Sequence, residues 1–159
     1  MEQLFNNSKY IFDSGPFIDL KNYPTDIFTT LWDNISQMIE NGQIISSSEV
    51  LRELENYDDE IAIWAKTQKK IFTKPTVSEL EMVKQILNIH PELVKQENIL
   101  SGKPYADPFV IAQAKHNNCI LVHREKYKLN AHKIPNVCLS FNVKEISLFE
   151  FFRLEKWKF

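Results

Sequence analysis

The sequence holds only three glycines among its 159 residues, and this scarcity argues against the glycine-rich phosphate loops of nucleotide-binding proteins. Gly102 and Lys103 have the form of the end of a P-loop. However, Glu97 occupies the position where that loop needs its first glycine, and Pro104 follows the lysine. The P-loop interpretation therefore fails.

Cysteine and long apolar runs are also scarce. The two cysteines, Cys119 and Cys138, lack the CxxC spacing of a zinc ribbon, and both lie in apolar segments. We expect them to be buried thiols of a reduced, cytoplasmic protein. No apolar stretch approaches the ~18 residues that a membrane helix needs, so we expect no membrane partner. The opening MEQLFNNSKY lacks the basic and apolar regions of a signal peptide, and we expect none there.

What the chain does contain is enough apolar material for a folded core. Hydrophobic residues make up 43% of the sequence, and its length suits one domain over residues 1–159. The formal net charge is −2, but residues 1–80 hold 7 Lys and Arg against 13 Asp and Glu, whereas residues 81–159 hold 12 against 8. This asymmetry permits a basic face beside an acidic site.

Strand and helix patterns alternate along the chain. Short apolar runs predict strands at residues 10–12, 43–46, 119–123 and 137–141. Apolar stripes and capping signals predict helices within residues 23–42, 46–56, 58–72, 76–87, 106–118 and 147–159. We expect Thr25 to cap the first helix, Ser46 or Ser48 the second, and a Thr76–Glu79 capping box the fourth. The alternation predicts an α/β fold with a central, mainly parallel sheet flanked by helices.

Four acids stand where strands end or helices begin. Asp13 closes the first expected strand, and Glu53 lies on the helix after the second. Asp107 opens the helix before the third strand, and Glu125 follows that strand. Because ligands collect outside the carboxyl ends of parallel strands, these acids can converge on one edge of the sheet. Two carboxylates ~4 Å apart repel by about 4 kcal/mol at an effective dielectric of about 20, so four together need protons or cations. Hard oxygen ligands suit Mg²⁺ or Mn²⁺.

Four segments, IFDSGPFI, SSSEVLRELEN, ADPFVIAQAK and ILVHREK, resemble the successive motifs of PIN-domain ribonucleases, in the same order. Two more, DDEIAIWAK and KIPNVC, resemble a PIN subfamily catalogued as a domain of unknown function and akin to VapC-type toxins. The resemblance covers nearly the whole chain, and ADPFVIA is its most specific match. It implies a PIN-like three-layer fold and a Mg²⁺- or Mn²⁺-dependent endoribonuclease that hydrolyses RNA phosphodiesters. It further implies the toxin of a toxin–antitoxin pair, with an antitoxin protein as partner.

The resemblance assigns both catalysis and metal binding to four acids, namely Asp13, Glu53, Asp107 and Glu125. Many relatives have Asp at the position of Glu125, and Thr or Ser at the position of His123. Ser14 stands at the family's usual Ser/Thr position, where it could orient a metal-bound water or bond to the nearby backbone.

Two further surfaces could bind partners. The basic loop after residue 123 is our choice for RNA phosphate contacts, through Lys126, Lys128, His132 and Lys133. An ordinary solvated face is the alternative. At the C-terminus, Trp157 and Phe159 could bind a partner or a second copy of the chain, as in a homodimer, although packing on the sheet is the simpler account.

Two rival functions stay open. An aspartyl-nucleophile phosphatase also places an Asp after its first strand, but it usually needs a second acid two residues later, where this chain has Gly15. The other rival is a PIN-like module that binds RNA or a protein without cutting, and the unusual residue Glu125 keeps that possibility open.

Overall fold

The computed structural model describes residues 9–159, so the segment where no signal peptide is expected lies largely outside the described residues. Within them, five short strands form an all-parallel sheet in the order β3-β2-β1-β4-β5. The strands are β1 (Tyr10–Phe12), β2 (Ile44–Ser47), β3 (Phe72–Thr73), β4 (Ile120–Val122) and β5 (Glu145–Ile146). The expected α/β fold with a central parallel sheet flanked by helices is confirmed.

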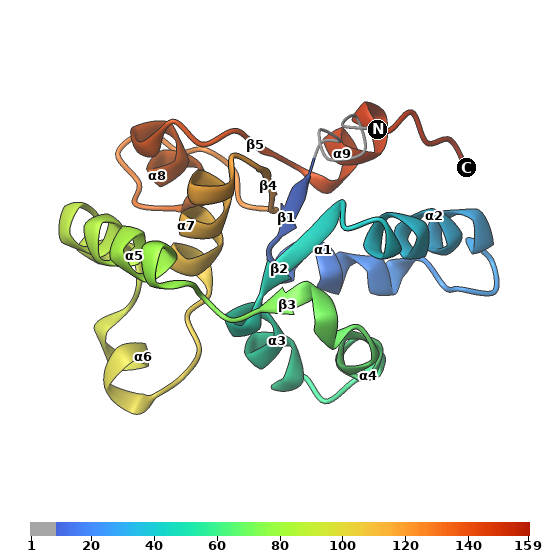
Figure 1. Cartoon of the computed structure of the whole chain (residues 1–159), viewed down its shortest axis with the longest axis horizontal. Coiled ribbons are helices and arrows are strands. Elements are labelled where there is room, and N and C mark those ends of the chain that lie inside the picture. Colours follow the sequence, from blue (N-terminus) through green and yellow to red (C-terminus); the bar gives the residue numbers. More distant parts are fainter. Residues whose placement is uncertain (1–8) are drawn as a thin grey trace.

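Helices cover both faces of this sheet and make the three layers visible in Figure 1. On one side lie α5 (Val77–Ile89), α6 (Gln96–Ser101), α7 (Asp107–Asn117) and α8 (Ile134–Phe141). On the other lie α1 (Ser14–Asp19), α2 (Thr29–Glu40), α4 (Glu60–Thr67) and α9 (Leu148–Leu154), with α3 (Ser48–Glu55) below the sheet in this view. No helix within residues 9–159 combines the length and the apolar character that crossing a membrane requires.

The central strand β1 is packed on both sides. Tyr10 and Phe12 point to one face, where both rings meet Phe151 of α9 edge-on, at centroid distances of 4.7 and 5.1 Å. Ile11 points to the opposite face, which α7 covers, and it is completely buried. The backbone that leads into Asp13 is therefore held in place from both sides.

One expected strand is wrong. Residues 137–141 belong to the helix α8, because the buried Ile134, Val137 and Cys138 recur at helical spacing and Pro135 stands in the first turn. A short apolar run does not distinguish a buried strand from a buried helix turn. The edge strand is instead β5, and neither it nor β3 was predicted. Cys138 and Cys119 are both buried, as expected.

The predicted helix caps have mixed outcomes. Thr25 does not cap α2, because the backbone N–H groups of Ile27 and Phe28 both donate to the Pro24 carbonyl and form a turn before the helix begins at Thr29. Ile27 lies in this turn, is 69% exposed and does not contribute to the buried face of α2. The capping box that begins α5 is confirmed.

The helix α3 is capped by a residue that lies between the two candidates. Ser47 accepts a hydrogen bond from the Glu49 backbone N–H at 3.2 Å, so the predicted caps at Ser46 and Ser48 are wrong. Ser46 is fully buried, and its hydroxyl donates to the Phe12 carbonyl at 2.6 Å. This bond ties β2 to the end of β1, immediately before the first acid.

Candidate active site

All four predicted acids line one pocket of about 380 Å³ at the carboxyl edge of the sheet. Asp13 directly follows β1, and Glu125 follows β4 after two intervening residues. Glu53 comes from α3, the helix that β2 leads into, and Asp107 is the first residue of α7. In a parallel sheet each strand ends at the carboxyl edge, and the helix before the next strand starts at that edge and runs back. The ends of β1 and β4 and the start of α7 therefore meet at the same edge.

Asp13 is the most buried of these acids, with 7% of its surface exposed. Its Oδ1 atom is buried and has no hydrogen-bond partner among the described residues. Burial, and next the nearby charge of Glu53, raise the pKa of Asp13 to about 7, while the Ser14 backbone N–H and the Arg124 guanidinium act in the opposite direction. Asp13 is thus a carboxyl group whose negative charge is poorly compensated by the protein.

The negative charge of Asp107 is also poorly compensated by the protein. Its pKa is raised well above the ordinary value, first by burial and then by the charges of Asp13, Glu125 and Glu53. Lys133 opposes this effect. The mutual influence of these carboxylates shows that the four acids form one electrostatic cluster.

Glu53 is held in one orientation by the protein. The Ser14 hydroxyl donates to its Oε1 at 2.8 Å, and the Ala106 backbone N–H donates to its Oε2 at 3.1 Å. Burial raises the pKa of Glu53, and these two hydrogen bonds lower it. Ser14 therefore contacts a side chain of the acid cluster, and the hydroxyl serves to orient a carboxylate.

Glu125 is held through both its backbone and its side chain. Its Oε1 accepts from the Ile134 backbone N–H at 2.9 Å, and its own N–H donates to Nδ1 of His123 at 3.0 Å. Because Nδ1 accepts, the proton lies on Nε2, which donates to Glu145 Oε1 at 2.6 Å. His123 is only 2% exposed, so this buried imidazole holds the backbone of the loop that carries Glu125 in place.

The donor chemistry of the pocket fits a hard divalent cation. The acids supply only carboxylate oxygens, and the unpartnered Oδ1 of Asp13 is one free ligand atom. Across residues 9–159, no three His, Cys, Asp or Glu side chains form a ready-made metal-binding group. Oxygens of Glu53 and Glu125 accept hydrogen bonds from protein donors, and each of these oxygens keeps a second lone pair that a cation could use.

The predicted RNA-binding residues are only loosely associated with the pocket. Lys126, Lys128, His132 and Lys133 are exposed, and none of them is among the described residues that line it. Lys133 is close enough to influence Asp107, whereas the His132 ring nitrogen Nδ1 lies 3.7 Å from a Glu92 carboxylate. The cations that do line the pocket, Lys103 and Arg124, were missed, although Arg124 lies inside the motif ILVHREK.

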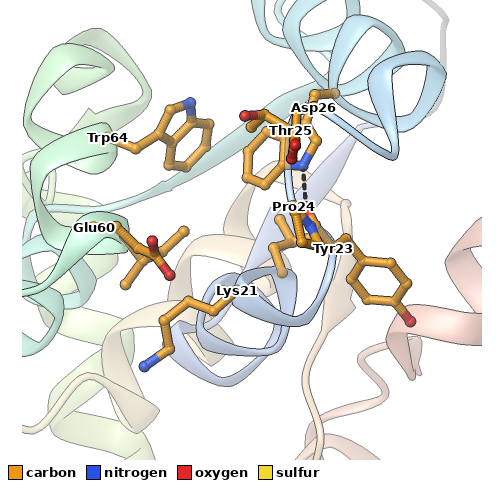
Figure 2. A pocket seen from close by; sticks show the side chains of 10 residues that line it. Lys21, Tyr23, Pro24, Thr25, Asp26, Glu60 and Trp64 are labelled. Atoms are coloured by element: carbon orange, nitrogen blue, oxygen red, sulfur yellow. Dashed lines mark hydrogen bonds between the residues drawn. The ribbon is translucent and has the colours of Figure 1, made fainter.

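A second pocket, of about 340 Å³, shares no lining residue with the acid pocket. Figure 2 shows Trp64 and Glu60 of α4 on one side of it and the Tyr23–Asp26 loop on the other. The rings of Trp32 and Trp64 meet at 5.4 Å in a T-shaped contact. Its two carboxylates, Asp26 and Glu60, are exposed, so this pocket lacks the buried acids that mark the first.

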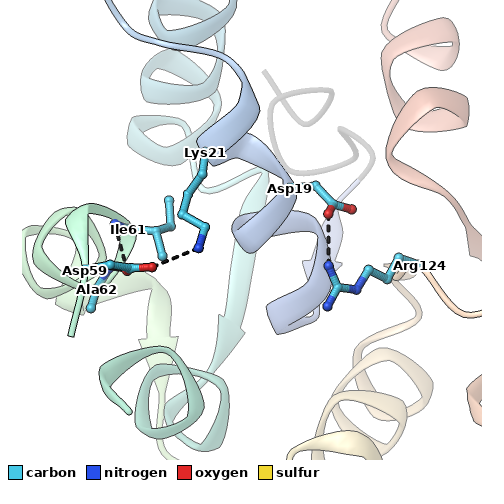
Figure 3. A network of polar contacts seen from close by, with 6 residues as sticks. All are labelled: Asp19, Lys21, Asp59, Ile61, Ala62 and Arg124. Carbon is cyan, nitrogen blue, oxygen red and sulfur yellow. Dashed lines mark hydrogen bonds and ion pairs between the residues drawn. The ribbon is translucent and has the colours of Figure 1, made fainter. Parts of the chain in front are cut away.

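Two ion pairs flank α1 and the short 3₁₀ helix η2 (Leu20–Asn22) that follows it, as Figure 3 shows. Lys21 Nζ lies 2.9 Å from Asp59 Oδ2, and Asp59 also caps α4 by accepting from two backbone N–H groups. On the other side, Arg124 Nη1 lies 2.9 Å from Asp19 Oδ1. The first pair joins η2 to α4, and the second joins α1 to the loop that carries Glu125.

The comparison with known families gives a match over nearly the whole chain. A family model described as "Domain of unknown function (DUF4411)" matches residues 10–159. The match spans every strand of the sheet and all four acids of the pocket. No curated protein matches the chain.

Proposed function

The chain belongs to the DUF4411 family, and we propose that it is a PIN-like, divalent-metal-dependent endoribonuclease that hydrolyses RNA phosphodiesters. The observation that carries this proposal is the convergence of Asp13, Glu53, Asp107 and Glu125 on one pocket. The resemblance of four sequence segments to PIN-domain ribonucleases assigns chemistry to the same four acids. Two independent lines of argument thus select one set of residues.

The electrostatics of the pocket favour a cation as the missing partner. Asp13 and Asp107 have raised pKa values because burial and neighbouring carboxylates disfavour their charged forms. A divalent cation removes that penalty and draws on the unpartnered Oδ1 of Asp13. When bound, Mg²⁺ or Mn²⁺ supplies Lewis acidity toward water and phosphate oxygens.

Each acid has a distinct part in this scheme. Asp13 and Asp107 would hold the cation, because their charges are the least compensated by protein groups. Glu53, oriented by Ser14 and the Ala106 N–H, would complete the ligand set. Glu125 would hold a second cation or orient the attacking water.

The surface around the acid pocket suits a chain substrate. A groove of about 620 Å³ shares Asn56, Lys103 and Pro104 with the pocket and continues toward Arg52. An extended strand could therefore run across the acids with phosphates on both sides of the cleavage point. This arrangement favours an endonuclease over a phosphatase that acts on a small phosphomonoester.

The resemblance to VapC-type toxins extends the proposal to a cellular role. The protein would slow growth by cutting RNA, and an antitoxin would mask the acidic pocket. Expression of the chain alone should then arrest growth, and Asp13→Ala should relieve the arrest. Equal arrest by both versions would contradict the toxin assignment.

The direct test is cleavage of single-stranded RNA by the purified protein in Mg²⁺ or Mn²⁺. Asp107→Asn should lower the rate by at least about 100-fold, as expected for loss of a group that stabilises transition-state charge. EDTA should abolish cleavage. The matched control is Asp33→Asn, which removes the same charge from the exposed face of α2 and should cut normally.

Two outcomes would overturn the nuclease proposal. Cleavage that persists undiminished in both Asp107→Asn and EDTA would point to a contaminating enzyme or to another mechanism. RNA binding without cleavage in any divalent cation would favour the non-catalytic module.

A further inference from the structure

Arg124 lies between two cavities and lines both of them. It lines the acid pocket, and it also lines a smaller cavity of about 220 Å³ that includes Asp19 and Phe149. Its side chain is 50% exposed, so the guanidinium is accessible to a ligand from solvent. Arg124 directly precedes Glu125. Its positive charge is near enough to Asp13 to oppose, in part, the burial and the carboxylate charges that raise the pKa of Asp13. A cation at this place lies beside the proposed reaction centre.

The stem of Arg124 crosses α1 directly above Gly15. A Cβ atom at residue 15 would lie 2.7 Å from Cγ of Arg124, 2.8 Å from Cδ and 3.0 Å from Nε. Real Cβ atoms essentially never approach another atom within 3.0 Å, as the distances to Cγ and Cδ would require. Only glycine therefore leaves room for Arg124 in this position, and any larger residue displaces it.

Asp19 fixes the guanidinium at the other end. Arg124 Nη1 donates to Asp19 Oδ1 at 2.9 Å, as Figure 3 shows. Within residues 9–159, Nε and Nη2 donate to no protein acceptor, so part of the donor fork stays available. Half-exposed ion pairs of this kind add little to stability, so bracing the fold is a poor explanation for so specific a placement.

We propose that Arg124 is a phosphate-binding residue that grips the RNA backbone beside the scissile phosphate, and that Gly15 and Asp19 are its positioning residues. The inference rests on the proposed nuclease function and names the contact that single-stranded RNA makes at the rim of the same pocket. Arg124 is suited to this role because a guanidinium matches the geometry of phosphate oxygens and keeps its charge at every physiological pH.

The test measures binding of a short, fluorescently labelled single-stranded RNA by anisotropy over a range of salt concentrations. All variants carry Asp107→Asn, so that the strand is not cut. Arg124→Gln should weaken binding by about 10-fold to 100-fold, as loss of a charged hydrogen bond implies. The slope of log affinity against log salt should fall by about 0.7, the value for one phosphate contact on a single strand. Arg153→Gln, an equal change on the exposed end of α9, is the matched control and should leave both quantities unchanged.

Gly15→Ala is the sharper variant, because it alters no charge. Alanine suits a helix, so the fold should persist while the added Cβ displaces Arg124. Binding should weaken as in Arg124→Gln. Asp19→Asn should weaken it less and Asp19→Glu should restore it. Thermal melting of each variant checks that the fold persists.

The outcomes separate this inference from the nuclease proposal. If Arg124→Gln and Gly15→Ala both bind RNA like the Arg153→Gln control, the phosphate-binding role is wrong, even where the unsubstituted chain cuts RNA. If only Gly15→Ala binds normally, the positioning role of Gly15 is wrong. A chain that binds RNA through Arg124 but never cuts it overturns the nuclease alone, and a chain that neither binds nor cuts overturns both.

Discussion

Asp13 and Glu79 are two acids that the fold buries almost equally, with 7% and 6% of their surfaces exposed. Glu79 lies on α5, where its Oε1 accepts from the Thr76 backbone N–H at 3.2 Å and its Oε2 accepts from the Asn117 amide at 3.0 Å. Asp13 lies at the end of β1 with Oδ1 unpartnered and with other carboxylates close by. Both are carboxyl groups removed from water, but only Glu79 has protein donors to both of its oxygens.

The contrast shows that burial by itself does not mark a functional acid. Glu79 joins the start of α5 to the end of α7, and its hydrogen bonds offset the cost of removing it from water. Asp13 retains that cost, and natural proteins tolerate such a cost mainly where activity requires it. The missing partner, together with the neighbouring negative charges, is what distinguishes the acid pocket from a structural polar contact.

The largest expected effect concerns stability and pH, measured in EDTA. The folded-state pKa of Asp13 is raised to about 7, so its stabilising contribution is complete below its ordinary pKa and is lost as pH rises through about 7. At about 1.36 kcal/mol per pKa unit, this loss is on the order of 4 kcal/mol. Asp107, whose pKa is also raised, changes stability in the same direction. Urea unfolding between pH 4 and pH 8 measures the decline.

Replacing each of the two buried acids by its amide should have opposite effects on stability at pH 8. Asp13→Asn should flatten the pH profile and stabilise the chain at pH 8, because it removes the uncompensated charge. Glu79→Gln should instead lower the free energy of unfolding by about 1–2 kcal/mol, since its new amide N–H₂ faces the Asn117 donor. If Asp13→Asn destabilises the chain at pH 8 as much as Glu79→Gln does, the contrast between the two acids does not hold.

A divalent cation should stabilise the folded chain through Asp13 and not through Glu79, and this increase in stability should be of intermediate size. At ~100 times its dissociation constant, a ligand that binds only the folded state adds about 2.7 kcal/mol. For a chain of this length, that raises the melting temperature by roughly 5–10 °C. Differential scanning fluorimetry with MnCl₂ should show this rise for the unsubstituted chain and for Glu79→Gln. Asp13→Asn should show little rise, and an equal rise in Asp13→Asn would place the cation elsewhere.

The acid cluster could be predicted from the sequence because topology alone produces it. Asp13 and Glu125 follow apolar runs that form strands, and Asp107 opens a helix with proline in its first turn. Once the sheet is parallel, the ends of these elements must meet at one edge. This reasoning uses only local patterns and the rule for ligand sites in parallel sheets.

Other features could not be predicted because they depend on tertiary contacts. VCLSF is too short for its period to separate a strand from a helix, and β3 and β5 have only two residues each. The contact between Gly15 and Arg124 joins the start of α1 to a loop far along the chain, and no local pattern reports it. The same holds for the bond from Ser14 to Glu53, which depends on how α1 and α3 lie against one another.

The smallest expected effect concerns His123, which does not line the acid pocket but holds the backbone of Glu125, a residue that does. Like Glu79, His123 is buried and partnered at both polar atoms, by the Glu125 N–H and by Glu145. Unlike Glu79, it is partnered to the backbone of a proposed catalytic residue. It should therefore act as a positioning residue, and its loss should affect cleavage as well as folding.

His123→Asn and His123→Leu separate these effects. The Asn Oδ1 can replace Nδ1 as acceptor for the Glu125 N–H, whereas Leu leaves that N–H unpaired at a cost of about 1–3 kcal/mol. We expect His123→Leu to lower kcat by roughly 10-fold with little change in KM, because the loss concerns the position of Glu125 in the transition state. His123→Asn should recover most of the rate. If both variants lose stability and activity in proportion, His123 supports the fold alone and belongs with Glu79, and the Glu125 loop is then positioned by its bond to Ile134.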